Sequence, residues 1–387
     1  MRFPEFHGEW EKCKLGDIAT GFDYGMNAPA KVFDGVNKYI RITDIDEASS
    51  TYNDSDIVSP DGTLTDTYLV NERDILLART GASTGKSYLY KKTDGKLYFA
   101  GFLIRANVPE HNPYFVFSQL HTHRYWKWVS IMSARSGQPG INSQEYSSFP
   151  IYTTSIQEER KISKLLSLLD ERIATQSKLI EDLKKLKSAI IDYAIDSLDA
   201  DFVKFGSLYE TAGEGGTPTT SNAQFYENGK IPFIKIDDLK QKYLTENNDF
   251  ITELGLQKSS AWLVPTRSIL FSNGATIGEI SITTYSVCTK QGILGIVPKQ
   301  NIDVEFLYYF MSSSYFKKAV SRIVTEGTMK TAYLKDINNI LCPIPIKEEQ
   351  QEIAKMPSAL NSKLDIEQSI LKLFGSQKQY LLRQMFM

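Results

Sequence analysis

Residues 155–198, SIQEERKISKLLSLLDERIATQSKLIEDLKKLKSAIIDYAIDSL, decide the fold because they predict one long helix in the middle of the chain. No proline or glycine interrupts this stretch. Glu158 and Glu159 stand in its first turn, where negative charge suits the helix dipole. At ~1.5 Å per residue such a helix is roughly 60 Å long, longer than a small domain needs. We therefore expect it to separate two globular units.

Apolar residues recur along this helix at the 3.5-residue spacing of a coiled-coil seam. Two positions of the seam are polar, Gln176 and Lys187. The apolar positions are Ile162, Leu166, Leu169, Ile173, Ile180, Leu183, Ile190 and Ala194.

The end of the chain, residues 346–387, repeats this seam. Its polar positions, Glu367 and Lys378, lie 191 residues after Gln176 and Lys187, so both stretches break the pattern at the same two places. Pro357 replaces the residue that matches Leu166, and we expect it to kink the second helix or delay its start to about Ser358. The apolar positions are Ile353, Leu360, Leu364, Leu371, Phe374, Leu381 and Met385.

Length and composition exclude several classes of protein. The 387 residues suffice for two or three domains, and an aromatic content of 12% argues against disorder. The net charge of −2 argues against a strongly basic DNA-wrapping protein, but allows a locally basic face or a basic partner. Three scattered cysteines predict neither a disulfide framework nor a metal site. With no signal peptide and no apolar run of ~18 residues, we expect a soluble, cytoplasmic protein without a membrane span.

The segments that precede the two long helices also repeat. The glycine segment 81–85 corresponds to 274–278, an offset of 193 residues. We expect a helix from Pro113 to Val129, capped by Asn112, and its counterpart from about Val304 to Val324. Strand-like runs of the first unit are 38–42, 74–79, 87–91 and 103–106.

The predicted architecture is therefore two tandem α/β (α+β) domains that alternate with two long helices. The domains are residues 1–154 and 199–345, and the helices are residues 155–198 and 346–387. Because a seam needs a partner, we expect the helices to pair. We favour an antiparallel coiled coil with a pseudo-two-fold axis, since a parallel pair needs longer connections. The helix-pair or partner-interface residues we expect are Ile162, Leu166, Leu169, Ile173, Ile180, Leu183, Leu364, Leu371, Phe374 and Leu381.

No motif predicts an active site. Residues 81–87, GASTGKS, resemble a P-loop but are one residue short, and Glu279 replaces Lys86 in the repeat, so we expect a tight glycine turn between two strands. Residues 112–115, NPYF, resemble the Asn-Pro-Pro-Tyr motif of amino-methyltransferases without its second proline, which favours a helix cap. The four histidines are spaced too irregularly for a metal site.

Two stretches are candidates for nucleic-acid contact. Residues 123–128, HRYWKW, suit stacking on bases, but packing of Tyr125 and Trp128 in the core explains them equally well. The polar loop 133–142 is the better candidate because it carries Arg, Gln and Asn, which contact base edges. Its counterpart, 325–331, has the same place in the repeat but carries different side chains. This difference suits two domains with different targets, although neutral drift in surface loops would also produce it.

Two globular units that alternate with two long helices resemble the specificity (S) subunit of type I restriction–modification systems. Residues 10–18, and 205–208 with 215–218, are similar to the start of the family's repeat. Residues 150–162 and 343–350 resemble its proline, acidic-Gln and helix signature. The resemblance covers the whole chain. Each motif is weak by itself, and the assignment rests on the duplication of these motifs in the same order.

The resemblance implies a non-catalytic subunit whose domains each recognise one half of a bipartite, asymmetric double-stranded DNA target. The helix pair would set the spacer and dock two methyltransferase (M) subunits, and two restriction/translocase (R) subunits would join. This chain would hold no cofactor, with S-adenosylmethionine, ATP and Mg²⁺ on the partners. Two alternatives stay open: the specificity subunit of a type II (type IIB/IIG-like) system, and a two-domain coiled-coil adaptor without a DNA role. The absence of methyl-donor and catalytic motifs argues against an enzyme that acts alone.

Loop position and side-chain type predict the DNA contacts. In the first domain they are Arg79, Ser83, Lys86, Arg135, Gln138 and Asn142. In the second they are Asn273, Thr276, Lys290, Thr328, Lys330 and Tyr333.

Overall fold

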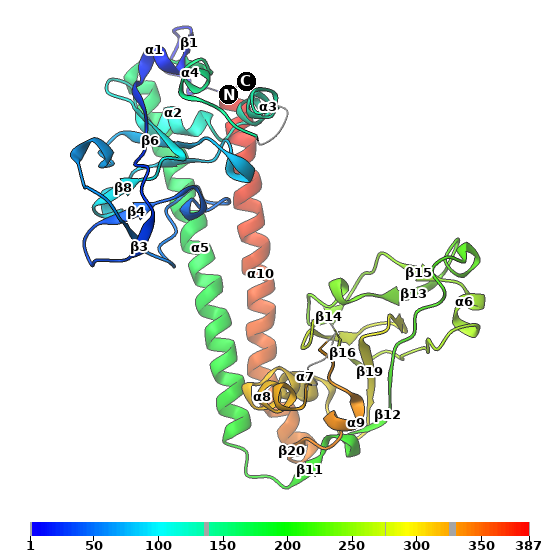
Figure 1. Ribbon diagram of the computed structural model, residues 1–387. Helices are drawn as coiled ribbons and strands as arrows, with labels where there is room; N and C mark the ends of the chain where they lie inside the picture. Colours follow the sequence, from blue (N-terminus) through cyan, green and yellow to red (C-terminus); the bar gives the residue numbers. More distant parts are fainter. Residues whose placement is uncertain (1, 135–138, 275, 325–329, 387) are drawn as a thin grey trace. The chain divides into compact units, whose positions relative to one another are not determined.

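The computed structural model describes residues 2–134, 139–274, 276–324 and 330–386. The chain forms two compact units, the first comprising Met1–Gln176 with Ile370–Met387 and the second Ser177–Ser369. Each unit holds one domain of helices and strands and a part of both long helices, α5 (Ile156–Asp196) and α10 (Lys347–Met385) (Figure 1). Since the division falls inside both helices, the domain limits given above stay predictions. None of the helices in the described ranges is long and apolar enough to cross a membrane.

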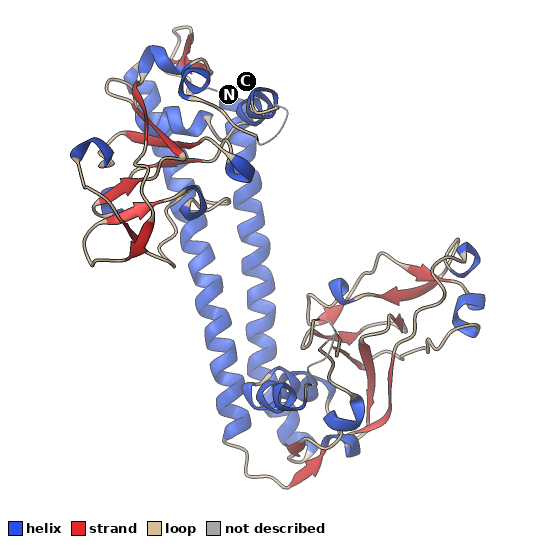
Figure 2. Ribbon diagram, viewed as in Figure 1, coloured by secondary structure: helices blue, strands red, loops and turns tan. Residues whose placement is uncertain are grey.

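The first domain is built on a four-stranded antiparallel sheet (Figure 2). Its strand order is β2 (Thr20–Tyr24), β9 (Leu103–Asn107), β6 (Asp74–Ala78) and β7 (Ser87–Leu89). Three strand pairs flank it: parallel β4 (Lys38–Ile40) and β8 (Leu97–Phe99), antiparallel β3 (Ala30–Val32) and β5 (Val58–Pro60), and antiparallel β1 (Glu11–Lys14) and β10 (Pro150–Thr153). All four predicted strand-like runs therefore form strands.

Strand β6 is apolar at nearly every position because both of its faces are covered. Ile75 and Leu77 pack in one core cluster with residues of the neighbouring helices. Leu76 and Ala78 point the other way, into a second cluster with Tyr88. This alternation is the two-residue period of a strand, so one short segment joins two cores.

The long helix predicted from Pro113 to Val129 is two helices, α2 (Pro113–Gln119) and α3 (His123–Met132), and that prediction is wrong. The Thr122 hydroxyl donates to the Gln119 carbonyl oxygen at 2.8 Å and accepts from the Tyr125 N–H at 3.3 Å. It therefore ends one helix and caps the next. The prediction of Asn112 as a cap is confirmed, because its Oδ1 accepts from the N–H groups of Tyr114 and Phe115.

The second domain breaks its expected helix, Val304 to Val324, in the same way. Ser313 stands between α7 (Val304–Ser312) and α8 (Ser314–Ile323), donating to the Phe310 carbonyl oxygen and accepting from the Phe316 N–H. A hydroxyl residue at the junction is thus a shared feature of the two domains.

The sheet of the second domain repeats the first and adds one strand. Its order is β12 (Tyr209–Glu214), β19 (Ile293–Pro298), β16 (Ile269–Ser272), β17 (Ile280–Thr283) and β14 (Tyr243–Leu244). A three-stranded sheet and one strand pair complete the strands: β15 (Phe250–Ile251), β13 (Ile231–Ile234) and β18 (Cys288–Thr289), and β11 (Phe202–Lys204) with β20 (Leu341–Pro343). The short helices of the two domains are α1 (Leu15–Ile18), α4 (Ser143–Ser147), α6 (Glu253–Gln257) and α9 (Leu334–Ile337).

The P-loop-like segment is the predicted tight turn between two strands in both domains. The Gly85 N–H donates to the Ala78 carbonyl oxygen, and the Gly278 N–H donates to that of Ser272, both at 3.0 Å. Gly85 and Gly278 have φ values of +93° and +109°, which glycine adopts without a steric cost. The backbone conformation therefore explains why both positions are glycine.

The long helices run antiparallel within each unit. In the first unit Ile162 and Leu166 of α5 share a core cluster with Leu382 and Met385 of α10. Further along α5, Asp170 forms a 2.6 Å ion pair with Lys378, so residue numbers rise along one helix as they fall along the other. In the second unit Lys187 donates to Asn361 at 3.0 Å, and Ile191 and Ile195 share a core cluster with Ala354.

Polar residues in the seam are held within it. Burial lowers the pKa of the Lys187 ammonium group, which bonds to the Asn361 amide oxygen. Gln176 and Glu367 are 7% and 5% exposed. A polar group in an apolar seam favours the one alignment that gives it a partner. The residues at which both sequence repeats break the apolar pattern therefore help to fix the register.

The delayed start predicted for the second helix is wrong, because α10 begins at Lys347 and contains Pro357. A proline removes one helical hydrogen bond, and contacts with the second domain hold the turns before it. The Gln350 side chain donates to the carbonyl oxygens of Asn301 and Pro345. Directly after the proline, the Ser358 hydroxyl accepts from the buried Lys242 ammonium group at 3.0 Å.

We predict that Leu364→Ala lowers the free energy of unfolding by about 2–5 kcal/mol, because it opens a cavity in the helix pair. Leu364 is 4% exposed, whereas Ile366 on the same helix is 56% exposed and gives a matched control. Ile366→Ala should change stability by less than about 0.5 kcal/mol. Urea denaturation of both variants measures the difference, and equal costs would contradict burial of this seam.

Candidate nucleic-acid interface

The structure brings two of the predicted segments of the first domain together. The Ile141 N–H donates to the Arg79 carbonyl oxygen at 2.9 Å, and the Gly81 N–H donates to that of Pro139 at 3.0 Å. The turn after β6, which carries Arg79, Ser83 and Lys86, therefore lies beside the loop end that carries Asn142. Arg135 and Gln138 lie outside the described residues.

These predicted side chains differ in how far they are already engaged. Lys86 pairs with Glu47 at 3.2 Å. Asn142 caps α4 by accepting from the Glu145 N–H, and Ser83 is half-buried. The Arg79 guanidinium lies over the Tyr24 ring, 4.8 Å from its centroid. Among the described residues its hydrogen-bond partner is the Gly101 carbonyl oxygen, at a long 3.5 Å.

The second domain joins the corresponding turn and loop end by the same backbone bond. The Ala332 N–H donates to the Asn273 carbonyl oxygen at 2.9 Å, as Ile141 does to Arg79. The Asn273 side chain is 1% exposed and donates to the Ala332 carbonyl oxygen. Thr276, Lys290, Lys330 and Tyr333 are exposed, and Thr328 lies outside the described residues.

A pocket of about 660 Å³ opens beside Arg79 in the first domain. Its lining includes Tyr24, Arg41 and Phe102, none of which is among the predicted contacts. Tyr24 and Phe102 are 42% and 57% exposed, and both line the same pocket. Comparison of the two repeats position by position could have identified them, since neither has an aromatic counterpart in the second domain.

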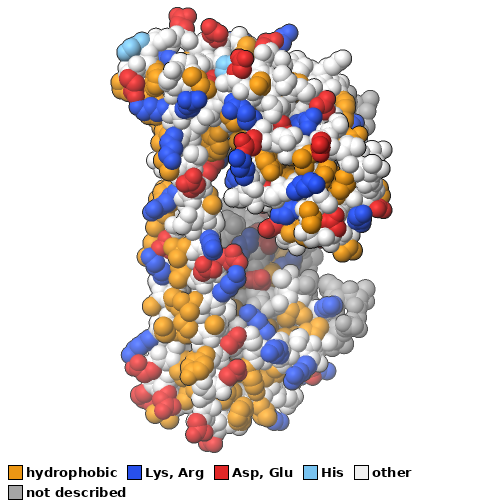
Figure 3. All heavy atoms as spheres, turned by 90° about the vertical axis from the view of Figure 1, so that its left-hand side faces the viewer, with side chains coloured by type: hydrophobic (Ala, Val, Ile, Leu, Met, Phe, Trp, Pro, Cys, Tyr) orange, Lys and Arg blue, Asp and Glu red, His pale blue; other side chains and the backbone are white. Residues whose placement is uncertain are grey.

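Charges around the pocket differ between its two arginines. Arg41 is neutralised by ion pairs with Asp44 at 2.8 Å and Asp56 at 3.1 Å. Hydrogen bonds with Ser143 lower the pKa of the Tyr24 hydroxyl. On the face that Figure 3 displays, basic and acidic side chains are interspersed and no large field of one sign forms. That face therefore carries no large basic patch of the kind that non-specific wrapping of DNA needs.

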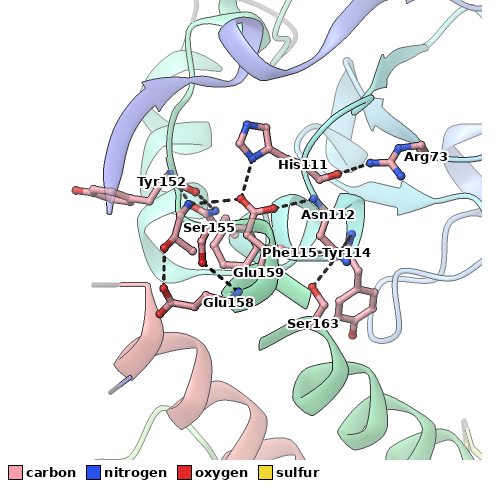
Figure 4. Close-up of polar contacts among 12 residues, drawn as sticks. Arg73, His111, Asn112, Tyr114, Phe115, Tyr152, Ser155, Glu158, Glu159 and Ser163 are labelled. Atoms are coloured by element: carbon pink, nitrogen blue, oxygen red, sulfur yellow. Dashed lines mark hydrogen bonds and ion pairs between the residues drawn. The ribbon is translucent and has the colours of Figure 1, made fainter. Parts of the chain in front are cut away.

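A buried carboxylate attaches the first domain to α5 (Figure 4). Glu159 is fully buried in the first turn of α5. Its carboxylate accepts from the Asn112 N–H at 2.7 Å and contacts His111 Nδ1 at 2.8 Å. Asn112 in turn caps α2 and accepts from the Ser163 hydroxyl at 2.8 Å. One glutamate thus joins the start of the long helix to the start of α2.

The neighbouring Glu158 ties down the beginning of the chain. Both of its oxygens accept from the Arg2 guanidinium at 2.7 Å, and Thr154 donates at 2.6 Å. Burial raises the pKa of this carboxyl, but the hydrogen bonds from Arg2, Thr154 and Trp10 outweigh it and lower the pKa below its ordinary value. Glu158 is therefore held in its ionised form.

The second domain is attached to its long helix in the same way, but by an uncharged amide in place of the carboxylate. Gln350 occupies the position of Glu159, and its Oε1 accepts from the Asp303 N–H at 2.8 Å. Asp303 caps α7 as Asn112 caps α2. The two domains are therefore attached to their long helices by equivalent hydrogen bonds, although the charge differs.

Residues 7–185 and 198–373 both match the type I restriction modification DNA specificity domain. The type I restriction enzyme MjaVIII specificity subunit of Methanocaldococcus jannaschii is 24% identical over 398 residues, which cover 94% of this chain and 90% of that protein. The EcoR124I/EcoR124II specificity subunit of Escherichia coli is 27% identical over 206 residues, half of each chain.

The same fold occurs in a solved structure. The crystal structure of the type I restriction–modification system S subunit from M. genitalium has a TM-score of 0.61 at 16% identity. The similarity covers 98% of this chain and 96% of that one. The repeated domains and long helices are therefore the architecture of a known class.

We predict that Glu159→Leu destabilises the first unit by about 1–3 kcal/mol, because the part-buried Asn112 N–H loses its acceptor. Glu159→Gln should cost much less, since Gln350 makes the equivalent bond in the second domain. Thermal unfolding of both variants measures the difference. If the leucine and glutamine variants were equally stable, the attachment of the first domain to α5 would not depend on this hydrogen bond.

Proposed function

This chain belongs to the family of type I restriction–modification DNA specificity domains, and we propose that it is the subunit that gives such a system its DNA sequence specificity. We propose that the chain catalyses no reaction itself. Each domain recognises one half of a bipartite, asymmetric target in double-stranded DNA, and the helix pair sets the unspecified spacer. The complex works in the cytoplasm, where the chromosome lies.

The observation that carries this proposal is a duplicated backbone frame with different side chains. Both domains share the strand order, the glycine turn and the bond from the loop end to the turn. At the residue that accepts this bond, the first domain has Arg79 and the second Asn273. A shared frame with exchanged polar side chains is what two binding units for different base sequences require.

Methylation and cleavage are proposed to belong to partners. Two methyltransferase subunits would carry S-adenosylmethionine and extrude the target adenine, and two restriction subunits would use ATP and Mg²⁺. Sharing phosphate contacts with such partners would reconcile DNA binding with a net charge of −2.

The outward side of the long helices supports a partner surface. Leu179, Leu186 and Tyr193 of α5 recur every seven residues and are 40%, 48% and 77% exposed. On α10, Ile366 and Leu373 show the same spacing and are 56% and 67% exposed. A second apolar stripe on a helix whose first stripe is already buried suits the docking of another helix. We assign these stripes to the methyltransferase subunits.

A genome-wide map of adenine methylation, with this gene intact and deleted, tests the proposed function. Deletion should abolish methylation at one split motif, two short half-sites around a fixed spacer. An unchanged map in cells that express an active partner methyltransferase would contradict the specificity role and favour a coiled-coil adaptor without a DNA role.

We predict that Leu179→Lys with Leu186→Lys weakens binding of the methyltransferase subunit at least about tenfold, because two charges enter an apolar interface. Ser177→Lys with Ser188→Lys adds the same charge at exposed polar positions of α5 and should leave binding unchanged. Co-purification and titration of the complex measure both. Equal affinity of the two double variants would place the docking surface elsewhere.

A further inference from the structure

Backbone hydrogen bonds align the pocket of the first domain with the second domain residue by residue. The Arg79 N–H donates to the Phe102 carbonyl oxygen, and the Asn273 N–H donates to that of Gly292, both at 3.0 Å. The Gly25 N–H donates to the Leu103 carbonyl oxygen, and the Gly215 N–H donates to the Ile293 carbonyl oxygen. Arg79 therefore corresponds to Asn273 and Phe102 to Gly292. Tyr24 and Glu214, which precede the paired glycines, also correspond.

Side chains at these three positions have opposite characters in the two domains. In the first, an arginine is stacked on an exposed tyrosine beside an exposed phenylalanine. In the second, the Glu214 carboxylate accepts from the Gly292 N–H at 3.0 Å, and Asn273 is buried. The frame is thus conserved between the repeats while its surface changes from aromatic and basic to acidic and flat.

The Arg79 guanidinium lies where it could bind a planar group such as a base. Its guanidinium lies on the Tyr24 ring, and the Tyr24 hydroxyl both donates to Ser143 Oγ and accepts from the Ser143 N–H, at 3.3 Å each. The ring is therefore fixed against the loop end beside Arg79. In the described parts of the chain no carboxylate pairs with Arg79, in contrast to Arg41 and its two aspartates.

We propose that Arg79, oriented by Tyr24 and flanked by Phe102, recognises a guanine in the half-site of the first domain. The Tyr24 ring beneath the guanidinium limits where this group can lie. The fork of N–H donors that arginine carries matches the O6 and N7 acceptors of guanine. The exposed Phe102 ring lines the same pocket and adds an apolar surface beside Arg79. This inference rests on the proposed function and adds one base type and its contact residue.

The experiment measures methylation of DNA duplexes by the assembled methyltransferase complex that contains this chain. The duplexes carry the mapped target with each position of both half-sites replaced in turn. The variants are Arg79→Ala and Arg79→Lys, with Lys92→Ala as the control. Lys92 is an exposed lysine of the same domain that pairs with Glu72, so its removal tests the loss of one positive charge away from the pocket.

For both Arg79 variants, discrimination for guanine should fall about 10- to 100-fold at one position of one half-site. The other half-site should stay fully selective, which shows that the complex is folded. Lysine keeps the charge but not the fork, so it should not restore the discrimination. Lys92→Ala should leave selectivity at every position unchanged.

Tyr24 has the role of a positioning residue. Tyr24→Phe keeps the ring and should retain the guanine preference, whereas Tyr24→Leu removes the stacking surface and should lower it at the same position as Arg79→Ala. An unchanged guanine preference in Tyr24→Leu would overturn the role of Tyr24 in orienting Arg79.

Other outcomes would overturn the proposal. An equal loss of activity on all duplexes with Arg79→Ala, restored by Arg79→Lys, would mean a phosphate contact. Unchanged selectivity in both Arg79 variants would mean that the pocket does not touch bases. If the unaltered complex methylated no split target at all, the proposed function itself would fail, which is a different result from either of these.

Discussion

The structure depends on the apolar seam between α5 and α10. Each α/β domain is attached to the first turn of its own long helix, through Glu159 of α5 in one case and Gln350 of α10 in the other. Each domain has core clusters of its own, but the first turn of each long helix holds the cap of α2 or α7. Because the carboxylate and the amide both accept from a cap N–H, the helix start and the domain orient each other.

This arrangement separates stability from recognition. The frame of each domain is made of backbone hydrogen bonds between a strand end, a glycine turn and a loop end, and those bonds do not require particular side chains. The residues carried by the frame are therefore free to differ, as Arg79 and Asn273 do. A protein whose partners stay the same while its DNA target changes needs such a division. The proposed guanine contact is one instance of a variable side chain on a constant support.

The sequence predicted the larger features because they follow from periodicity and duplication. The seven-residue spacing and the shared polar positions located both helices, and the repeat located the glycine turn. The long helix predicted from Pro113 failed because the Thr122 hydroxyl satisfies backbone groups at a break that the apolar pattern does not mark. The effect of Pro357 was overstated because contacts of Gln350 and Ser358 with the second domain hold the helix on both sides of it.

The candidate interface could be predicted only in part. Arg79 was found from loop position, but the stacking partner Tyr24 lies 55 residues away in the sequence, and only the pairing of β2 with β9 and of β9 with β6 brings them close. Lys86 and Asn142 have side-chain types suited to DNA, yet the fold engages them in an ion pair and a helix cap. Composition and spacing cannot distinguish a free polar group from one already bonded, since that depends on tertiary contacts.

An exchange of one domain tests whether each domain recognises its own half-site. Residues 199–345 would be replaced by the corresponding domain of a relative with a known bipartite target, and the methylated motif of the hybrid would be mapped. We predict that one half-site changes to that of the donor, while the other half-site and the spacer length are kept. A hybrid that assembles and methylates DNA but changes both half-sites, or neither, would contradict recognition by two independent domains on a common helical support.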